Sequence, residues 1–547
     1  MKQYLYLPLL LSLVLSASSC KKDFLSKKPL DSFSDADVWT DLSLVQAFVN
    51  SRYTILPFME DKGVQKAYFM SGACDEGYSK HNYGNEIALV TSQISPDNTV
   101  YDFWGQNYAE IRNCNLFLSK IGDVPATSPA NQALKNRMTG EIKFLRAYGY
   151  FDLIQHYGGV PYITKVYGLS DTSFKVARNT FDECVQFILK DIDSAITLLP
   201  ADYNADNVGR VTSVGAMALK SRLLLYAASP LNNPSNDAAK WQAAWNATKA
   251  AIDFAETNGH QLYQNADYKS IFLDKRNPEI LLSYNFSSVP GGGIDIVCQP
   301  NSYFGWSVYT PSQAMVDAFE MKNGKPITDV TSGYDPAHPY DNREPRFYAD
   351  ILYNGAIFKG TPVEIFAGGK DSPQGDQGWN ATSTGYNWRK YMDESFVIGA
   401  RGSNQNWIIF RLAELYLNFA EASYEINNEP LALQYVNKIR SRASVNLPPI
   451  TESGLALRDR IRNERRIELC FESHRIYDVR RWKIAPQTES KPLIAVTVTK
   501  TGSNITYQYF TLQQRKWEDK LYWWPISRNE MNKNGGPGGL AQNPGYN

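Results

Sequence analysis

The sequence predicts a mainly α protein, built as a scaffold of tetratricopeptide-like helical hairpins and interrupted by long irregular loops. Three observations support this fold class. From about residue 140 onward, apolar residues recur at helical spacing. Short polar turns separate consecutive helical segments, which favours antiparallel helix pairs. Residues 286–407 are instead rich in Gly, Pro, Asn and aromatic residues and show no helical period, so we expect long loops carried on a rigid scaffold.

The first element is an export signal, residues 1–19. Lys2 precedes about 14 apolar residues, fewer than the roughly 20 that a membrane-spanning helix needs. Small residues follow, and Cys20 then stands directly before Lys21 and Lys22. This order resembles a bacterial lipobox, in which the cysteine thiol is acylated, for example with palmitate, and becomes the new N-terminus. We expect a lipid anchor on Cys20; ordinary secretion with Cys20 in an unmodified tail is the alternative.

The helical pairs can be followed along the chain. The stretch "FDECVQFILKDIDSAITLLP" places apolar residues on one helix face: Cys184, Ile188, Ile192, Ala195 and Leu199. In "TSVGAMALKSRLLLYAAS", Thr212 or Ser213 is the expected N-cap and Pro230 ends the helix. After "LNNPSND", a second helix carries the stripe Trp241, Trp245, Thr248, Ile252 and Ala255. "WIIFRLAELYLNFAEASYEI", "NNEP" and "LALQYVNKIRSRA" predict a similar pair near the C-terminus.

Composition excludes some functions and leaves others open. Removing residues 1–19 takes away one basic side chain from a balanced total of 56 basic and 56 acidic residues. A nearly neutral chain argues against nucleic-acid binding, which depends on neutralising phosphates. Length alone allows three or four domains at roughly 150 residues each. Because no Pro-, Gly- or Ser-rich linker divides the middle of the chain, we expect a single domain over residues 20–547 with a loop-rich insertion at about 286–407.

Neither a disulfide framework nor a metal centre is expected. The five cysteines after Cys20 are widely separated and odd in number, which favours buried free thiols. The five histidines are scattered without metal-ligand spacing. "DYNADNVGR" begins like a calcium loop, but Asn207 replaces the turn glycine and Ser213 stands where the bidentate Glu belongs. We therefore predict no metal and no cofactor.

Four long blocks carry a resemblance to a known family: "FLRAYGYFDLIQHYGGVPYI", "FRLAELYLNFAEA", "RNERRIELCFESHRIYDVRRW", and "LYWWPISRNEMNKN" followed by "QNPGY". They resemble the signature blocks of the SusD/RagB family of outer-membrane lipoproteins of Bacteroidetes. The resemblance implies a SusD-like fold, with the loops forming a ligand-binding face and no enzymatic activity. It also implies a lipid-anchored protein on the cell exterior, which sits on a SusC-like TonB-dependent transporter and delivers captured oligosaccharides to it.

Two alternatives remain open. In the RagB branch the ligand is a peptide, and a helical scaffold of this kind could also bind a protein partner without any small ligand. The sequence does not identify the ligand, although the family favours a glycan.

Candidate ligand residues come from segments rich in aromatic and amide side chains, because the C–H face of a sugar packs on an aromatic ring and its hydroxyl groups need polar partners. Trp104 and Asn107 lie about one helical turn apart, as a Trp and an Asn do in starch-binding members of the family. "CDEGYSKHNYGN" adds Asp75 and Tyr78, beside Glu76 and Tyr83. "QPNSYFGWSVY" adds Tyr303, Trp306 and Tyr309.

Charged residues in the third family block are expected to be structural. Glu464 and Glu468 are one turn apart, so an internal network of carboxylates and forked guanidinium groups is predicted. The expected partners are Arg465, Arg466, Arg475, Arg480 and Arg481. Asp75 and Glu76 are not expected to form a glycosidase pair. Adjacent side chains on an extended chain point apart, whereas two carboxyl groups must face a sugar across roughly 5–9.5 Å.

Overall fold

The structure is a computed structural model that describes residues 38–57, 70–168, 170–171, 175–203, 207–285, 293–397, 404–536 and 538–546. Cys20 and the predicted export signal lie outside these ranges. Within them, none of the helices combines the length and the hydropathy that a membrane crossing requires.

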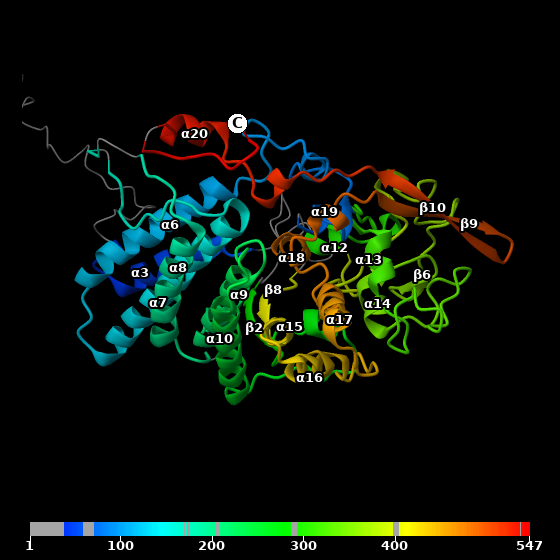
Figure 1. Cartoon of the computed structure of the whole chain (residues 1–547), viewed down its shortest axis with the longest axis horizontal. Helices are drawn as coiled ribbons and strands as arrows, with labels where there is room; N and C mark the ends of the chain where they lie inside the picture. Colours follow the sequence, from blue (N-terminus) through cyan, green and yellow to red (C-terminus); the bar gives the residue numbers. More distant parts are fainter. Residues whose placement is uncertain are drawn as a thin grey trace, which may run out of the picture.

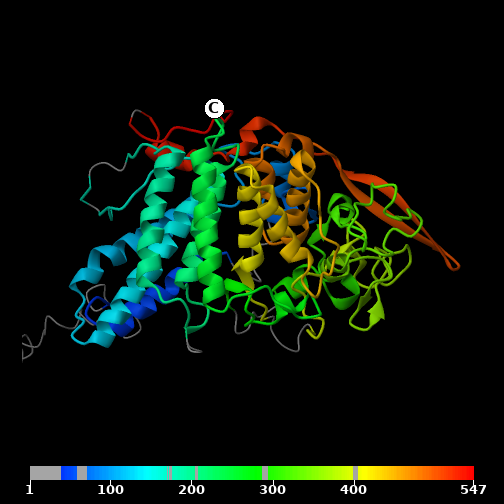
Figure 2. The same ribbon diagram turned by 60° about the horizontal axis from the view of Figure 1, so that its bottom comes forward.

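Helices dominate the fold, which confirms the mainly α prediction. The long helices are α3 (Leu42–Arg52), α6 (Phe103–Lys120), α7 (Pro129–Tyr157), α8 (Phe181–Leu198), α9 (Ser213–Ala228), α10 (Ala238–Thr257), α15 (Leu412–Glu425), α16 (Glu429–Arg440) and α17 (Gly454–Glu468). Short helices are α5 (Glu86–Val90), α11 (Ser270–Leu273), α18 (Arg475–Arg481), α19 (Ala485–Thr488) and α20 (Arg528–Asn534). Figures 1 and 2 show the long helices packed side by side in chain order from α6 to α17.

Local sequence explains where individual helices begin and end. Thr180 and Glu183 form a capping box at the start of α8, each side chain bonding the other's backbone N–H. The predicted apolar stripe of α8 is buried. Helix α7 ends at Gly158, whose positive φ of 73° suits a glycine. The next residue, Gly159, lies so close to the chain that an added Cβ would stand 2.1 Å from the carbonyl oxygen of Asn179.

Both predicted helical hairpins are present. Thr212 caps α9 by accepting a hydrogen bond from the backbone of Gly215, and α10 packs antiparallel to α9 after the Asn-rich turn. Helix α16 packs on α15 in the same way.

The start of the second hairpin differs from the prediction. Trp407–Arg411 is not helical but forms strand β8, which pairs antiparallel with β2 (Ile280–Tyr284). Its Trp-Ile-Ile-Phe sequence is rich in aromatic and β-branched side chains, which favour a buried strand once a partner strand is available.

The loop-rich part of the chain contains only short elements in the residues that the structure describes between 293 and 397. They are α12 (Gly293–Val297), α13 (Gln313–Ala318), α14 (Pro345–Asp350), β3 (Tyr309–Pro311), β4 (Ile351–Leu352), β5 (Ile357–Phe358), β6 (Thr361–Pro362), β7 (Asn387–Trp388) and the 3₁₀ helices Asn301–Tyr303 and Gly378–Asn380. Strand β3 pairs with β1 (Gly77–Ser79), β4 with β7, and β5 with β6. One continuous apolar core extends from Trp39 to Tyr546 through both parts.

A long hairpin near the C-terminus was not predicted. Strands β9 (Leu493–Thr501) and β10 (Asn504–Gln513) pair antiparallel and extend away from the helices, beside the loop-rich part (Figures 1 and 2). Strand β9 lies against the body, where its Val496 N–H donates to the carbonyl oxygen of Thr384.

An internal ion-pair network around Glu464 and Glu468 is confirmed, and it is buried, but its arginines are not the predicted ones. The predicted arginines of the third family block bond Asp75, Asp478, Glu421 or backbone carbonyl oxygens instead. Glu468 accepts hydrogen bonds from Arg346, Arg411 and Arg442 at 2.9, 2.7 and 2.7 Å. Glu464 binds Arg346 and Arg440 at 2.6 and 2.8 Å. Burial opposes ionisation, yet the surrounding guanidinium charges hold the pKa values of both carboxyl groups below the ordinary value. This arginine–carboxylate network joins α17 to α14, α16 and β8.

Candidate functional site

Four exposed aromatic rings lie on three loops that hydrogen bonds hold together. Tyr83, Phe304, Trp306 and Trp379 have exposed fractions of 50%, 64%, 38% and 69%. We call these four residues the aromatic platform. Exposed apolar surface gathered in one region is a feature of binding sites, so these rings are candidates for ligand contact.

Lys80 links all three platform loops. Its backbone N–H donates to the carbonyl oxygen of Val308 at 2.8 Å. Its ammonium group donates to the carbonyl oxygens of Trp379 and Ala381, both at 2.7 Å. Partial burial lowers the pKa of Lys80. The ammonium group of Lys80 therefore holds the backbone of the platform loops in place, and its hydrogen bonds are directed to carbonyl oxygens rather than to a ligand.

Other contacts fix the platform loops further. The pairing of β1 with β3 sets Tyr78 opposite Thr310. The side-chain amide of Asn301 donates to the carbonyl oxygen of Asp376 at 2.6 Å, joining the loop of Trp306 to that of Trp379. The indole N–H of Trp379 donates to Oε1 of Gln377 at 3.1 Å, and the ring of His81 stacks on Tyr83 at 5.4 Å.

The backbone at Phe304 is strained. Phe304 has φ of 61°, a left-handed conformation that costs roughly 1–2 kcal/mol for a residue with a side chain. The following Gly305 leaves no room for a side chain, since a Cβ there would stand 2.0 Å from the carbonyl oxygen of Gln299. The loop therefore turns tightly enough to present two large rings at the surface, a kind of strain that concentrates at functional sites.

The structure places the residues predicted from "QPNSYFGWSVY" at different depths. Trp306 belongs to the aromatic platform. Tyr303 is half-buried, and its hydroxyl group contacts the carbonyl oxygen of Phe358 at 3.1 Å. Tyr309 is buried and donates to Glu86 at 3.0 Å, so it helps to hold the loop in place and is not exposed to a ligand. Tyr78 is partly exposed on β1.

Two other predicted residues are occupied by internal contacts. Asp75 is buried and bonds Arg475 at 2.8 and 2.9 Å, with Arg466 at 3.0 Å. Although burial opposes ionisation, these arginines lower the pKa of Asp75. Asn107 is fully buried, and its amide donates to Asp152 and to the carbonyl oxygen of Phe103. Trp104, one turn earlier on α6, is also buried and lines a cavity beside that helix. Trp104 and Asn107 therefore do not form one exposed subsite.

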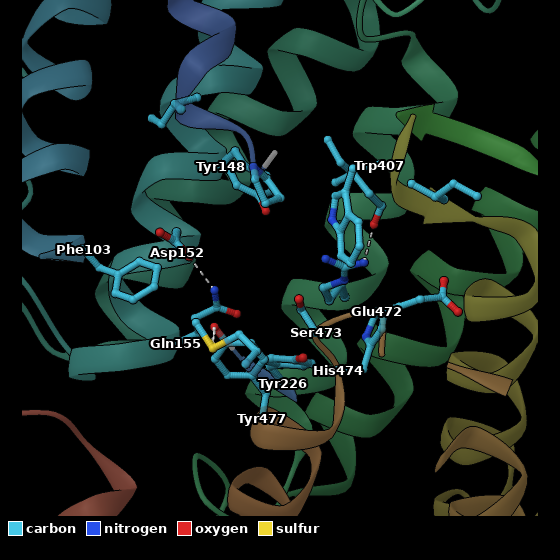
Figure 3. A pocket seen from close by; sticks show the side chains of 16 residues that line it. Phe103, Tyr148, Asp152, Gln155, Tyr226, Trp407, Glu472, Ser473, His474 and Tyr477 are labelled. Atoms are coloured by element: carbon cyan, nitrogen blue, oxygen red, sulfur yellow. Dashed lines mark hydrogen bonds between the residues drawn. The ribbon is translucent and has the colours of Figure 1, made fainter. Parts of the chain in front are cut away.

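A small cavity of about 50 Å³ lies among the helices. Figure 3 shows its walls, which come from α7, α9, β8 and the segment that leads into α18. Asp152, Arg222, Glu472 and His474 contribute polar groups, and burial together with nearby arginine charges keeps the pKa of His474 well below its ordinary value. A space of this size holds a few water molecules and no sugar ring.

Phe304 and Trp379 are not among the ligand residues predicted from the sequence. Both lie in predicted loops, where the local sequence does not distinguish an exposed aromatic ring from a buried one. The available signals were the Phe-Gly pair at 304–305 and the Gly-Trp-Asn triplet at 378–380, which are typical of tight turns.

Comparisons with known proteins agree along nearly the whole chain. A family model described as "SusD family" matches residues 251–546, and one described as "Starch-binding associating with outer membrane" matches residues 23–225. SusD-like protein P25 of Formosa agariphila is 26% identical over 423 residues, covering 74% of each chain.

Solved structures are similar as well. A SusD-like protein from Bacteroides fragilis has a TM-score of 0.81 at 31% identity and covers 95% of this chain and 100% of its own. A second protein of that organism, described as a SusD-like carbohydrate binding protein, has a TM-score of 0.78 at 25% identity, covering 91% and 99%.

Proposed function

This chain belongs to the SusD family, and from that premise we propose that it captures oligosaccharides at the cell surface on its aromatic platform. The observation that carries the proposal is the set of four exposed rings on three hydrogen-bonded loops. The description of the N-terminal family model as starch-binding, and that of the similar Bacteroides fragilis structure as carbohydrate binding, support a glycan ligand.

The chemistry of the platform suits a sugar chain. Each ring offers a flat apolar face to the C–H groups of one sugar unit. Asn82 directly precedes Tyr83, and Gln377 lies two residues before Trp379 and accepts its indole N–H, so their amide groups could meet hydroxyl groups at the ring edges. Ligand contact by Trp306, Tyr303 and Tyr78 is part of this proposal.

Capture is the first step of the proposed role. Acylation of Cys20 would anchor the protein to the outer membrane with the platform outside the cell. A SusC-like TonB-dependent transporter would then receive the oligosaccharide. The proposal includes no chemical change to the ligand.

Isothermal titration against a panel tests the ligand class. The panel consists of soluble starch, mixed-linkage β-glucan, xylan, mannan and a casein peptide digest, titrated into the mature chain with Cys20→Ser. We expect one neutral glycan to bind and to quench Trp fluorescence, and Trp306→Ala to weaken that binding. Binding of peptides alone, or glycan binding that Trp306→Ala and Trp379→Ala leave unchanged, would overturn the proposal.

Anchoring and delivery need separate measurements. Mass spectrometry of the N-terminal peptide from native membranes should show an acylated Cys20. Affinity purification of the anchored protein from its own cells should recover a TonB-dependent transporter. An unmodified thiol, or recovery of the protein without any such transporter, would contradict these parts of the role.

A further inference from the structure

A second cavity opens beside helix α6. None of its lining residues belongs to the aromatic platform. Its volume is about 310 Å³. We call it the α6 cavity. Its walls come from α6, from the segment after α7, and from α20 and the turn that follows it. Most of the wall is apolar and is made by Trp104, Tyr108, Ile163, Tyr167, Val176 and Leu540.

The walls of the α6 cavity are held in place by internal hydrogen bonds. The hydroxyl group of Tyr108 donates to the carbonyl oxygen of Pro161 at 2.7 Å. The amide of Asn115 donates to the carbonyl oxygen of Ile163 at 2.8 Å, and the Tyr150 hydroxyl group donates to the same oxygen. The cavity is therefore preformed, and ligand binding would not require free energy to order its walls.

Trp104, which lines this space, carries an unused donor. Its side chain is 95% buried and its ring packs on Tyr108 and Tyr157 at 5.1 and 5.2 Å. In the described part of the chain, no group accepts a hydrogen bond from its indole N–H. That nitrogen keeps some accessible surface, and because the side chain is otherwise buried and lines the α6 cavity, an acceptor in the cavity is the partner that we infer for it.

The charged groups around the α6 cavity differ in how they are engaged. Lys165 pairs with Asp171 and lies over the ring of Tyr167. Glu530 accepts from Lys533 and Asn534 at 3.4 and 3.3 Å. Arg112, exposed on α6, has no ion pair or hydrogen bond with any residue in the described ranges. Its guanidinium group is the lining cation that remains available.

We propose that the α6 cavity binds a small ligand with a flat apolar body and one carboxylate group. The apolar body would fill the space between the rings of Trp104, Tyr108 and Tyr167. The carboxylate would accept hydrogen bonds from the indole N–H of Trp104 and the guanidinium of Arg112. A sugar fits this cavity poorly, because most of its wall would leave hydroxyl groups without partners.

A matched pair of probes tests the proposal on the mature chain with Cys20→Ser. Naphthalene-2-carboxylate and naphthalene-2-carboxamide have the same body, and only the first is charged. By isothermal titration, we expect the carboxylate to bind about 10-fold or more tightly than the amide. Equal binding of the two, or no binding of either, would overturn the proposal.

Variants locate the binding site. Arg112→Ala should reduce the affinity of the carboxylate to that of the amide and leave the amide unchanged. Arg458→Ala serves as the control, because Arg458 is a partly exposed arginine of α17 that does not line the α6 cavity and forms an ion pair with its neighbour Asp459. Val176→Trp should fill the cavity and weaken both probes. If Arg112→Ala acts no differently from Arg458→Ala, or if Val176→Trp leaves both affinities unchanged, the probes bind elsewhere and the proposal fails.

Two further readouts separate this site from the platform and from misfolding. Thermal unfolding of each variant checks that the fold is intact. Trp104→Phe keeps an aromatic ring but removes the donor, so it should weaken the carboxylate several-fold. Saturation with the glycan identified by the panel should leave naphthalene-2-carboxylate binding unchanged, and competition between the two would contradict separate sites.

Discussion

The helical part and the platform loops place polar and aromatic side chains in opposite ways. On α17, Glu468 has no exposed surface and is surrounded by three arginines. On the platform, Trp379 is 69% exposed while the amide and carbonyl groups around it are bonded to one another. Charge is buried where the fold is held together, and aromatic surface is exposed where a ligand could bind. Stability and recognition therefore depend on different residues, which separate measurements can distinguish.

Breaking the arginine–carboxylate network should have the largest effect. Glu468→Ala leaves three guanidinium groups buried without their common partner, so we expect a loss of about 3–5 kcal/mol in the free energy of unfolding. Urea unfolding measures it. The control is Glu452→Ala, since Glu452 forms a more exposed ion pair with Arg460 and should cost only about 0–1 kcal/mol. Equal losses in the two variants would show that the network does not hold the fold together.

The free energy of unfolding should depend on pH through Glu76, a buried carboxyl group that contacts the segment after α17. Glu76 precedes β1, and its carboxylate lies 3.3 Å from the backbone nitrogen of Phe471. Burial and the charge of Asp75 raise the pKa of Glu76 to about 8. The folded protein thus keeps a proton that the unfolded chain releases above about pH 4.5. This contribution to stability is complete at low pH and is lost as the pH rises toward 8.

Glu76→Gln should remove that dependence. We expect the decline in the free energy of unfolding between pH 5 and 8, which Glu76 can make as steep as about 1.4 kcal/mol per pH unit, to become flatter. Glu464 and Glu468 act with the opposite sign, because their lowered pKa values give stability that is lost on acidification. Urea unfolding at several pH values should therefore show the same loss below pH 5 in both proteins. Identical slopes above pH 5 would contradict the assignment.

Removing platform rings should change affinity without changing stability. Trp379→Ala and Trp306→Ala should each weaken the bound glycan by about 10-fold, or about 1.4 kcal/mol. Because both rings are exposed, the free energy of unfolding should change by no more than about 0.5 kcal/mol. Titration and urea unfolding measure the two quantities, and Val330→Ala, at a 99% exposed position, is the control. If a variant lost stability and kept its glycan affinity, the claim that stability and ligand binding depend on different residues would be wrong.

Removing the hydrogen bonds by which Lys80 holds the platform loops should have the smallest effect on glycan affinity. Lys80→Met removes two hydrogen bonds to carbonyl oxygens in the Trp379 loop while keeping most of the side chain. We expect glycan affinity to fall about 3- to 10-fold and the loop at 377–381 to become more sensitive to protease. Lys80→Arg should restore part of both. Unchanged affinity together with increased cleavage would show that the loop does not need to be fixed for binding.

Much of the scaffold could be predicted from the sequence, since α8 and α10 each show an apolar stripe, and α9 lies between its N-cap Thr212 and Pro230. Trp407–Arg411 was assigned to the wrong element because a short apolar run has no period of its own, and the partner strand β2 decides its conformation. The β9–β10 hairpin does show alternating β-branched residues around Thr-Gly-Ser-Asn, which is a readable turn signal.

The site was harder to predict than the scaffold. Trp306 was identified as a candidate, but nothing local distinguishes it from the buried Tyr309 three residues later. Asn107 is buried because α7 places Asp152 beside it, which a motif on α6 cannot reveal. Exposure of Phe304 and Trp379 depends on how three distant loops dock on one another, and that depends on contacts such as those of Lys80.

The cysteines determine how the molecule can be studied. Cys74, Cys114, Cys184, Cys298 and Cys470 are all buried and unpaired, and burial raises the pKa of each thiol, so little reactive thiolate forms. An acylated Cys20, as proposed above, has no free thiol, so a single cysteine introduced at the exposed Ser503 on the hairpin tip would react alone with a maleimide dye while the anchor stays intact. Fluorescence from that one label could then follow the orientation of the anchored protein without further redesign of the chain.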